Sequence, residues 1–238
     1  MNERTMRAEM LLGAAAMEKL NNSHVAVFGI GGVGSWCAEA LVRAGVGTLT
    51  LIDMDTVSPT NINRQLCALT STVGLPKAEV MAARIRDINP DIRVNALVGA
   101  YSAAERDKFF GEYDFVADAI DLVSAKLDLI MTCRERGIPM ISALGTGNKQ
   151  QANLLEITDI SKTYGCALAR VVRKELRARG VEHHTVVFSP EEPMTPAALE
   201  APPPGRRSVP GSLVWVPASA GLLMSQHIVS ELTKEERA

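Results

Sequence analysis

A glycine-rich turn between an apolar strand and a helix constrains this chain more than any other feature. Residues 25–30 are apolar and predict a strand, Gly29, Gly31 and Gly34 follow in the spacing GxGxxG, and a helix is expected next. A second apolar segment, 48–52, predicts another strand. Strand, turn, helix and strand in this order make a βαβ unit, whose strands are parallel and whose crossover is right-handed.

The alternation of strands and helices continues to residue 143. Helices are predicted at 77–88 and 124–136, and strands at 92–98, 115–120 and 139–143. This pattern predicts an α/β fold, a doubly wound, Rossmann-like, mostly parallel sheet with helices on both faces. Beyond Gly145 the alternation breaks down, so a smaller C-terminal α+β extension is expected.

The remaining segments are less regular. A helix is predicted at 5–20, strands at 153–157 and 185–188, a proline-rich loop at 190–210 and a last helix at 218–232. We therefore divide the chain into a nucleotide-binding, Rossmann-like region, 1–145, and a C-terminal region, 146–238, of the same domain. The second region is expected to bind substrate and to dimerise.

Composition is that of a soluble globular protein, for which a cytoplasmic location is expected. The 238 residues are 47% hydrophobic and 22% charged, and no apolar run approaches the ~20 residues of a membrane span. The charged N-terminus lacks the apolar core of an export signal. The four cysteines, Cys37, Cys67, Cys133 and Cys166, form no CxxC pair. They predict small buried side chains in a reducing compartment, and no zinc.

The glycine loop predicts a nucleotide that contains a ribose. Glycines let the backbone approach a phosphate, and the N-terminus of the following helix offers free N–H groups and partial positive charge. Asp53 ends the second strand, nineteen residues after Gly34, where a carboxylate can accept hydrogen bonds from ribose hydroxyls. The alternative is a glycine turn that only packs the helix on the strand.

Residues beyond Asp53 favour ATP over a dinucleotide. Loss of pyrophosphate requires positive groups and usually Mg2+ to neutralise the leaving charge. Arg64, within Asn61-Ile62-Asn63-Arg64-Gln65, suits a bidentate phosphate contact, and Lys77 offers a second cation. Ordinary surface positions remain the alternative for both.

Two aspartates complete the predicted site. Asp118 and Asp121 lie at the end of the strand predicted at 115–120, in the segment 116–121, at the edge where open α/β sheets bind their ligands. Asp121 is the better candidate for holding the metal.

These motifs resemble those of the ubiquitin-activating superfamily, which includes the ThiF and MoeB adenylyltransferases. The motifs GIGGVGSW, LIDMD, NINRQ, GLPKAEV and DAID occur here in the superfamily's order, over roughly residues 10–143. The resemblance implies adenylation of a carboxylate, with Arg64, Lys77 and Asp121 catalytic and Asp121 holding Mg2+. The implied ATP-binding residues are Gly29, Gly31, Gly32, Gly34, Asp53, Asp55, Asn61, Asn63, Arg64, Gln65, Lys77 and Asp121.

The second half resembles one branch of that superfamily, the tRNA threonylcarbamoyladenosine dehydratases (TcdA- and CsdL-like proteins). The segments TDISKT, CALAR, VFS and VPASAG carry this resemblance. It implies that the threonine carboxylate of a modified adenosine in tRNA is adenylated, after which an intramolecular attack expels AMP and leaves a ring. It also implies a homodimer, and it leaves open a cysteine desulfurase-type partner.

A basic segment independently favours a nucleic-acid substrate. Residues 162–179 contain six basic residues and a single acidic one, Glu175, in a chain of net charge −2. On a helix, four of the basic residues share one face, and Leu168, Val172 and Leu176 lie on another. The predicted tRNA-binding residues are Lys162, Arg170, Arg173, Lys174 and Arg177. An ordinary solvated face is the alternative.

Two other functions remain open at this point. One is a ThiF- or MoeB-like enzyme that activates the C-terminus of a ubiquitin-like or sulfur-carrier protein. Such an enzyme would need an apolar groove for its partner rather than a basic helix face. A nicotinamide-dependent oxidoreductase is disfavoured by Arg64, Lys77 and Asp121.

Overall fold

A seven-stranded sheet forms the centre of the computed structural model, which describes residues 3–199 and 209–234. The strands are β1 His24–Phe28, β2 Thr48–Asp53, β3 Arg93–Val98, β4 Phe115–Asp118, β5 Met140–Ala143, β6 Glu156–Asp159 and β7 Thr185–Phe188. Their order is β3-β2-β1-β4-β5-β7-β6, and only β6 runs antiparallel to its neighbour. The predicted α/β fold with a mostly parallel sheet is confirmed.

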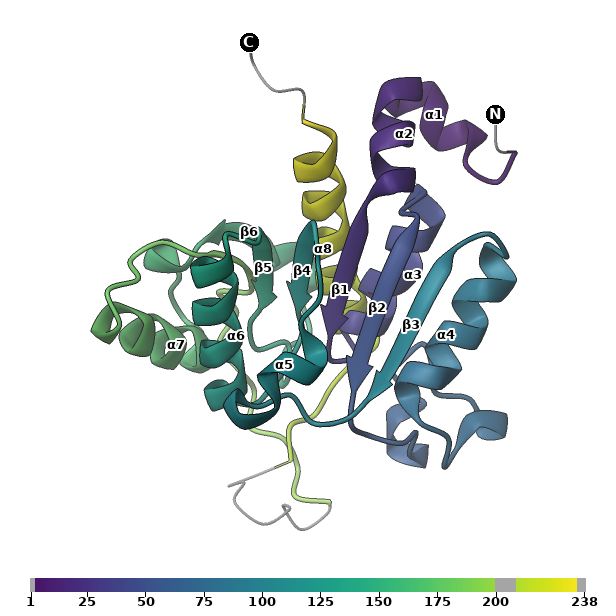
Figure 1. Cartoon of the computed structure of the whole chain (residues 1–238). Coiled ribbons are helices and arrows are strands. Elements are labelled where there is room, and N and C mark those ends of the chain that lie inside the picture. Colours follow the sequence, from purple (N-terminus) through teal and green to yellow (C-terminus); the bar gives the residue numbers. More distant parts are fainter. Residues whose placement is uncertain (1–2, 200–208, 235–238) are drawn as a thin grey trace.

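Helices cover both faces of the sheet (Figure 1). They are α1 Met6–Leu12, α2 Ala14–Asn22, α3 Gly34–Ala44, α4 Lys77–Ile88, α5 Arg106–Phe109, α6 Val123–Arg136, α7 Ala167–Ala178 and α8 Trp215–Thr233. The core on one face contains residues of α3, α4 and α8, and the cores on the other contain residues of α5, α6 and α7. Within the two described ranges, no helix combines the length and apolarity of a bilayer span.

Alternate residues of β1 enter opposite cores. Val25 and Val27 pack with α3, α4 and α8, whereas Ala26 and Phe28 pack with α5 and α6. All four are fully buried. Because a parallel sheet between two helical layers has no solvent-facing side, its strands are mainly apolar, as the segments 25–30 and 115–120 are apart from Asp118.

The last helix packs closely on α3. A Cβ at Gly221 would lie 2.4 Å from the carbonyl oxygen of Val33 and 2.9 Å from the amide nitrogen of Cys37. Only a glycine lets the two backbones approach this far. The contact brings the first turn of α8 against the glycine-rich turn that follows β1.

Several predicted boundaries are wrong, for local reasons. The helix expected at 5–20 is broken at Gly13, whose φ of 83° and ψ of 161° are not helical. The strand expected at 115–120 ends at Asp118, whose side chain accepts the amide of Ile120 and so turns the chain away from the sheet. The last helix begins at Trp215 rather than at residue 218, since a proline is tolerated in a first turn.

The C-terminal half adds strands to the main sheet. β7 pairs in parallel with β5, and β6 pairs antiparallel with β7. The predicted strand 153–157 is shifted, since Ala152–Leu154 form a 3₁₀ turn. Of the predicted loop 190–210, residues 190–199 and 209–210 have no regular structure, and 200–208 lie outside the described residues. The division at residue 145 stays a prediction.

A buried histidine makes stability depend on pH. His184 is 8% exposed, and its Nε2 lies 2.8 Å from the hydroxyl of Ser142. Burial lowers the pKa of His184 to about 3, and the charges of Lys126 and Arg134 act in the same direction. The unfolded chain therefore takes up a proton at this residue near pH 6.5, while the folded chain does not.

We expect a change of His184 to Gln to flatten the pH dependence of folding. Between pH 7 and 5 the wild type should lose about 2 kcal/mol more unfolding free energy than the variant, because only its unfolded state gains this proton. Chemical denaturation at pH 7, 6 and 5 measures the difference. Parallel pH profiles would show that His184 is not held neutral.

Candidate active site

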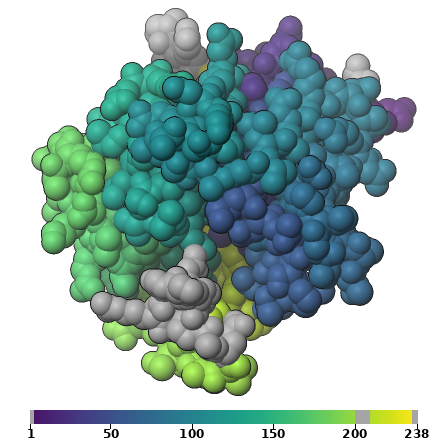
Figure 2. Space-filling model, turned by 60° about the horizontal axis from the view of Figure 1, so that its bottom comes forward, coloured from purple at the N-terminus to yellow at the C-terminus, as the bar shows by residue number. Residues whose placement is uncertain are grey.

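The site lies where neighbouring strands send the chain to opposite faces of the sheet. The chain leaves β1 for α3 on one face, and leaves β4 for α6 on the other. β1 and β4 are adjacent and parallel. Crevices at the carboxyl ends of such strands are where open α/β sheets bind ligands. Figure 2 shows the molecule turned so that this end comes forward.

The first and last glycines of the loop are required by its shape. Gly29 has a φ of +88°, and a Cβ there would lie 2.7 Å from the carbonyl oxygen of Ala119. A Cβ on Gly34 would lie 1.8 Å from the carbonyl oxygen of Gly29. These two glycines therefore fix the turn and join it to the loop after β4.

The middle glycines leave room for a ligand. A Cβ on Gly31 would meet a single atom within 4 Å, Nε2 of Gln65 at 3.8 Å. Gly32 lies against Pro217 of α8, 3.2 Å from the position of its missing Cβ. The first N–H groups of α3 have no acceptors within the helix, but those of Ser35 and Cys37 donate to the carbonyl oxygens of Gly31 and Val33. A phosphate can thus approach the backbone at Gly31, as the spacing predicted.

A buried oxygen of Gln65 without a hydrogen-bond partner points to a ligand. Its side chain is 8% exposed, and its Oε1 is the one buried side-chain oxygen or nitrogen in the described ranges without a hydrogen-bond partner. An unsatisfied buried acceptor costs about 1–3 kcal/mol. A ligand hydroxyl or amine beside the glycine loop would remove that cost, so the residues fit a nucleotide.

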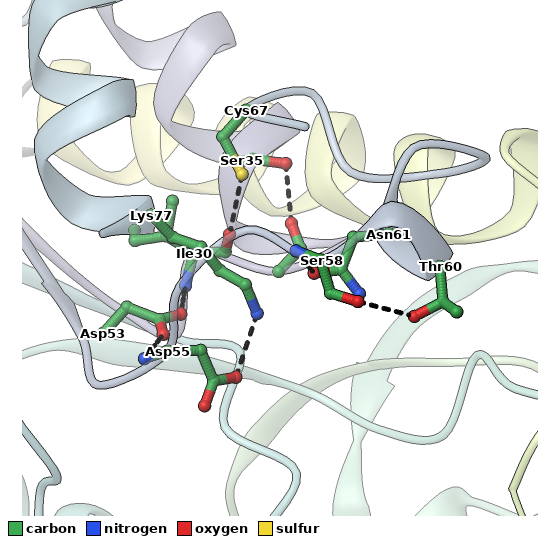
Figure 3. Close-up of polar contacts among 10 residues, drawn as sticks. Ile30, Ser35, Asp53, Asp55, Ser58, Thr60, Asn61, Cys67 and Lys77 are labelled. Atoms are coloured by element: carbon green, nitrogen blue, oxygen red, sulfur yellow. Dashed lines mark hydrogen bonds and ion pairs between the residues drawn. The ribbon is translucent and has the colours of Figure 1, made fainter. Parts of the chain in front are cut away.

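Asp53 ties the glycine loop to the end of β2. Its Oδ2 accepts the N–H of Ile30 at 2.5 Å, and its Oδ1 accepts that of Asp55 at 2.8 Å (Figure 3). Burial raises the pKa of Asp53, against the effect of these bonds and of Lys77. Each carboxylate oxygen keeps further acceptor capacity, which suits ribose hydroxyls.

Lys77 and Asp55 form a second polar contact at the same edge. Lys77 begins α4, and its Nζ lies 2.9 Å from Oδ2 of Asp55 (Figure 3). The lysine side chain is 6% exposed, whereas that of Asp55 is 55% exposed. The cation is thus withdrawn from solvent, and the carboxylate in front of it is accessible.

One nitrogen of the Arg64 guanidinium is hydrogen-bonded to the protein. Nη1 donates to the carbonyl oxygen of Thr60 and to Oδ1 of Asn63, both at 2.9 Å. Nε and Nη2 make no hydrogen bond within the described residues. Burial lowers the pKa of Arg64, and the charge of Asp121 opposes this effect. The arginine therefore carries free donors close to an acidic residue from the loop after β4.

The side chains of the two asparagines in the run 61–65 form hydrogen bonds with backbone groups of the protein. Oδ1 of Asn61 accepts the N–H of Ser58 at 3.1 Å and so closes the 3₁₀ turn Pro59–Asn61 (Figure 3). Nδ2 of Asn63 donates to the carbonyl oxygen of Ser212 at 2.9 Å. Asn63 thus connects the segment before α8 to Arg64.

A buried ion pair lies beneath this site. Nζ of Lys126 lies 2.6 Å from Oδ2 of Asp118 and 3.0 Å from the carbonyl oxygen of Ala143, and both charged side chains are fully buried. Sequence reasoning missed Lys126. The available signal was its helical spacing from Leu129, Ile130 and Cys133, which places a lysine on the buried face of α6.

Asp121 is exposed and stands apart from other metal ligands. Within residues 3–199 and 209–234, no group of three or more His, Cys, Asp or Glu side chains could hold a metal ion. A site for Mg2+ would therefore need oxygens from a bound phosphate, which is how Mg2+ is commonly held.

The predicted basic face is largely exposed. Lys162, Arg170, Lys174 and Arg177 are exposed, and Val172 and Leu176 of α7 are buried as expected. Leu168 is only half-buried, and Ala169 is the third buried residue of this helix. Arg173 differs, because its Nη1 donates to the carbonyl oxygen and the hydroxyl of Thr163. That residue has a partner within the protein.

The four cysteines are free and buried, as predicted. Cys67 lies behind the glycine loop, with its Sγ 3.6 Å from the carbonyl oxygen of Ile30 (Figure 3). Burial raises the pKa of Cys67 to about 11 and that of Cys37 to about 12. Cys166 caps α7 by accepting the N–H of Ala169 at 3.5 Å.

We expect two glycine substitutions to separate folding from nucleotide binding. Gly31→Ala has space for its methyl group, so stability should be unchanged, while ATP affinity should fall about tenfold or more because the phosphate approach is blocked. Gly29→Ala should lower stability by at least about 1–2 kcal/mol. Thermal unfolding and calorimetric ATP titration test both, and full ATP affinity in Gly31→Ala would place the phosphates elsewhere.

The chain is similar to known proteins in sequence and in fold. The chain is 44% identical to the tRNA threonylcarbamoyladenosine dehydratase of Bacillus subtilis over 96% of this chain and 94% of that protein. It is also 44% identical to the Escherichia coli dehydratase over 71% of this chain and 63% of that protein. The crystal structure of E. coli TcdA with ATP matches with a TM-score of 0.87 and 37% identity, over 97% of this chain and 93% of the other.

A family model gives the same result over nearly the whole chain. The ThiF family model matches residues 3–238, which include the glycine loop, Arg64, Asp121 and α8. The chain belongs to the ThiF family.

Proposed function

We propose that this chain is an ATP-dependent dehydratase that cyclises threonylcarbamoyladenosine in tRNA. The observation that carries the proposal is the position of Arg64, whose free donors lie close to Asp121 at the glycine loop. The similarity to dehydratases in sequence and to ATP- and AMP-bound TcdA in structure supports the substrate.

The chemistry proceeds in two steps. An oxygen of the threonine carboxylate attacks the α-phosphorus of ATP, and pyrophosphate leaves. The carbamoyl group then attacks the activated carbonyl carbon, the bond to AMP breaks, and a ring forms. The overall loss of water is driven by ATP cleavage, and proximity within one nucleoside favours ring closure without an enzyme-bound acyl group.

In this proposal each residue of the site has its own role. Asp53 binds the ribose, and the backbone at Gly31 and Gly32 receives phosphate. Arg64 and Lys77 neutralise the charge that develops as pyrophosphate leaves. Of the predicted ATP contacts, Asn61 and Asn63 are assigned to shaping the loop, because backbone groups already use their side chains.

The proposal includes RNA contact through the exposed cations Lys162, Arg170, Lys174 and Arg177, with Arg173 holding the loop at Thr163. It also includes a cytoplasmic location, a homodimer and a cysteine desulfurase-type partner. The exposed side chains of Met10 and Leu11 on α1 support a homodimer, since they offer apolar surface for a second copy. The location and the desulfurase-type partner rest on the sequence expectations alone.

Nucleoside mass spectrometry tests the function directly. The protein is incubated with ATP and with tRNA from cells that lack it, and the nucleosides are analysed. The expected result is threonylcarbamoyladenosine lighter by one water. An unchanged nucleoside, together with ATP-dependent adenylation of a small carrier protein, would favour activation of a carrier C-terminus instead.

We expect Arg64→Ala to fold normally and to lose turnover about 100- to 1,000-fold, because one donor to the transition-state charge is removed. Circular dichroism checks the fold, and ring formation in single-turnover experiments measures the loss. Near-normal turnover in the folded variant would remove Arg64 from the reaction.

We expect Asp121→Asn to require more Mg2+ for half-maximal turnover, and to recover part of its activity at high Mg2+, because one anionic ligand is lost. Titration of Mg2+ at saturating ATP measures this. The same Mg2+ dependence in both proteins would place the metal on other oxygens.

A further inference from the structure

The ring of Tyr164 is exposed at the start of α7. Its residue is 60% exposed, whereas its neighbours Thr163 and Cys166 are 5% and 6% exposed. The aromatic side chain thus lies in solvent although Thr163 and Cys166, on either side of it, are buried.

The backbone on both sides of Tyr164 is fixed. Arg173 donates to the carbonyl oxygen and the hydroxyl of Thr163. Gly165 has a φ of +67°, and a Cβ there would lie 2.4 Å from the carbonyl oxygen of Pro190. The amide of Cys166 donates to the carbonyl oxygen of Tyr164 at 2.7 Å.

The side chain is supported as well. The rings of Tyr164 and Phe188 meet edge to face, with centroids 5.8 Å apart and planes at 73°. Phe188 is 1% exposed at the end of β7. One part of the tyrosine thus rests on the core while the rest faces solvent. A rigid aromatic ring binds at a low entropic cost.

Exposed cations lie in the same segment of the chain as the ring. Lys162 lies two residues before Tyr164, and Arg170 and Lys174 are exposed on α7. The acidic residue of this helix, Glu175, is paired with Arg179 through contacts of 2.7 Å. Aromatic rings beside exposed cations are the combination that binds unpaired nucleotides, since the ring stacks on a base and the cations contact phosphates.

The surface also adjoins the active-site edge of the sheet. Gly145, two residues beyond the end of β5, is close to Cys166, whose Sγ lies 3.6 Å from where a Cβ of that glycine would be. β5 is the direct neighbour of β4, whose following loop carries Asp121. The segment that carries Tyr164 is therefore in contact with the chain that leaves the carboxyl end of β5.

We propose that Tyr164 is the platform on which an unpaired base of the RNA substrate stacks, next to phosphate contacts from Lys162, Arg170 and Lys174. This inference rests on the proposed function. An enzyme that reacts with a group on a base must take that nucleotide out of a helical stack, and an aromatic surface replaces the stacking that its neighbours lose.

The test compares stacking with charge in the full-length protein. The affinity for tRNA from cells that lack this protein is measured at several salt concentrations. Tyr164→Ala should bind about 5- to 150-fold more weakly with the same salt slope, because stacking releases no counterions. Tyr164→Phe should bind as the wild type does. Tyr164→Leu should be as weak as the alanine variant.

A charge variant and a surface variant serve as controls. Arg170→Gln together with Lys174→Gln should flatten the slope of log K against log salt by about 0.7–0.9 for each lost contact. Leu69→Ala removes an exposed apolar side chain, to which no role is assigned, from the segment between β2 and α4, and should change nothing. ATP affinity and melting temperature report on folding in every variant.

The outcomes distinguish the two proposals. Three results would each overturn the stacking platform and leave the dehydratase function standing. The first is ring formation and RNA affinity that survive in Tyr164→Ala, and the second is wild-type binding by Tyr164→Leu. The third is a changed salt slope in Tyr164→Ala. A wild type that neither binds nor modifies tRNA would overturn both.

Discussion

The buried ion pair of Asp118 and Lys126 is the interaction on which the site depends. Removing two charges from water costs several kcal/mol per ion, so such a pair persists only with close contact and further hydrogen bonds. Here Lys126 also donates to Ala143, and Asp118 accepts the amide of Ile120. The pair therefore fixes β4, β5 and α6 together, along with the turn after β4. That turn meets Gly29 through Ala119, so both halves of the nucleotide site share this support.

Local patterns predicted the elements around the nucleotide well. The helix 77–88 and the strand 185–188 have the predicted bounds, because capping, periodicity and apolar runs are encoded within the segment itself. The position of β7 beside β5 was not predicted, since strand pairing is decided by distant residues. Gly13 also escaped prediction, because a glycine inside an amphipathic pattern is compatible with either a continuous helix or a break.

For the candidate site, the sequence indicated residue types but not the contacts that these residues make. The glycine spacing indicated which backbone approaches a phosphate, and the structure leaves that space at Gly31. The run 61–65 indicated polar groups but not their partners. Asn61 and Asn63 bond to backbone, and Arg173 bonds to Thr163, because carbonyls and amides from other segments compete for the same side chains. Such competition appears only once the chain is folded.

The contact of Gly32 with Pro217 determines when the nucleotide site is completed during synthesis. α8 packs against α3 through Gly221, and its first turn borders the glycine loop. On the ribosome, the glycine loop emerges long before this helix does. Pro217, which borders the glycine loop, is added only when translation reaches α8. The candidate nucleotide site, which begins at β1, is therefore complete only after nearly all of the described chain has been made.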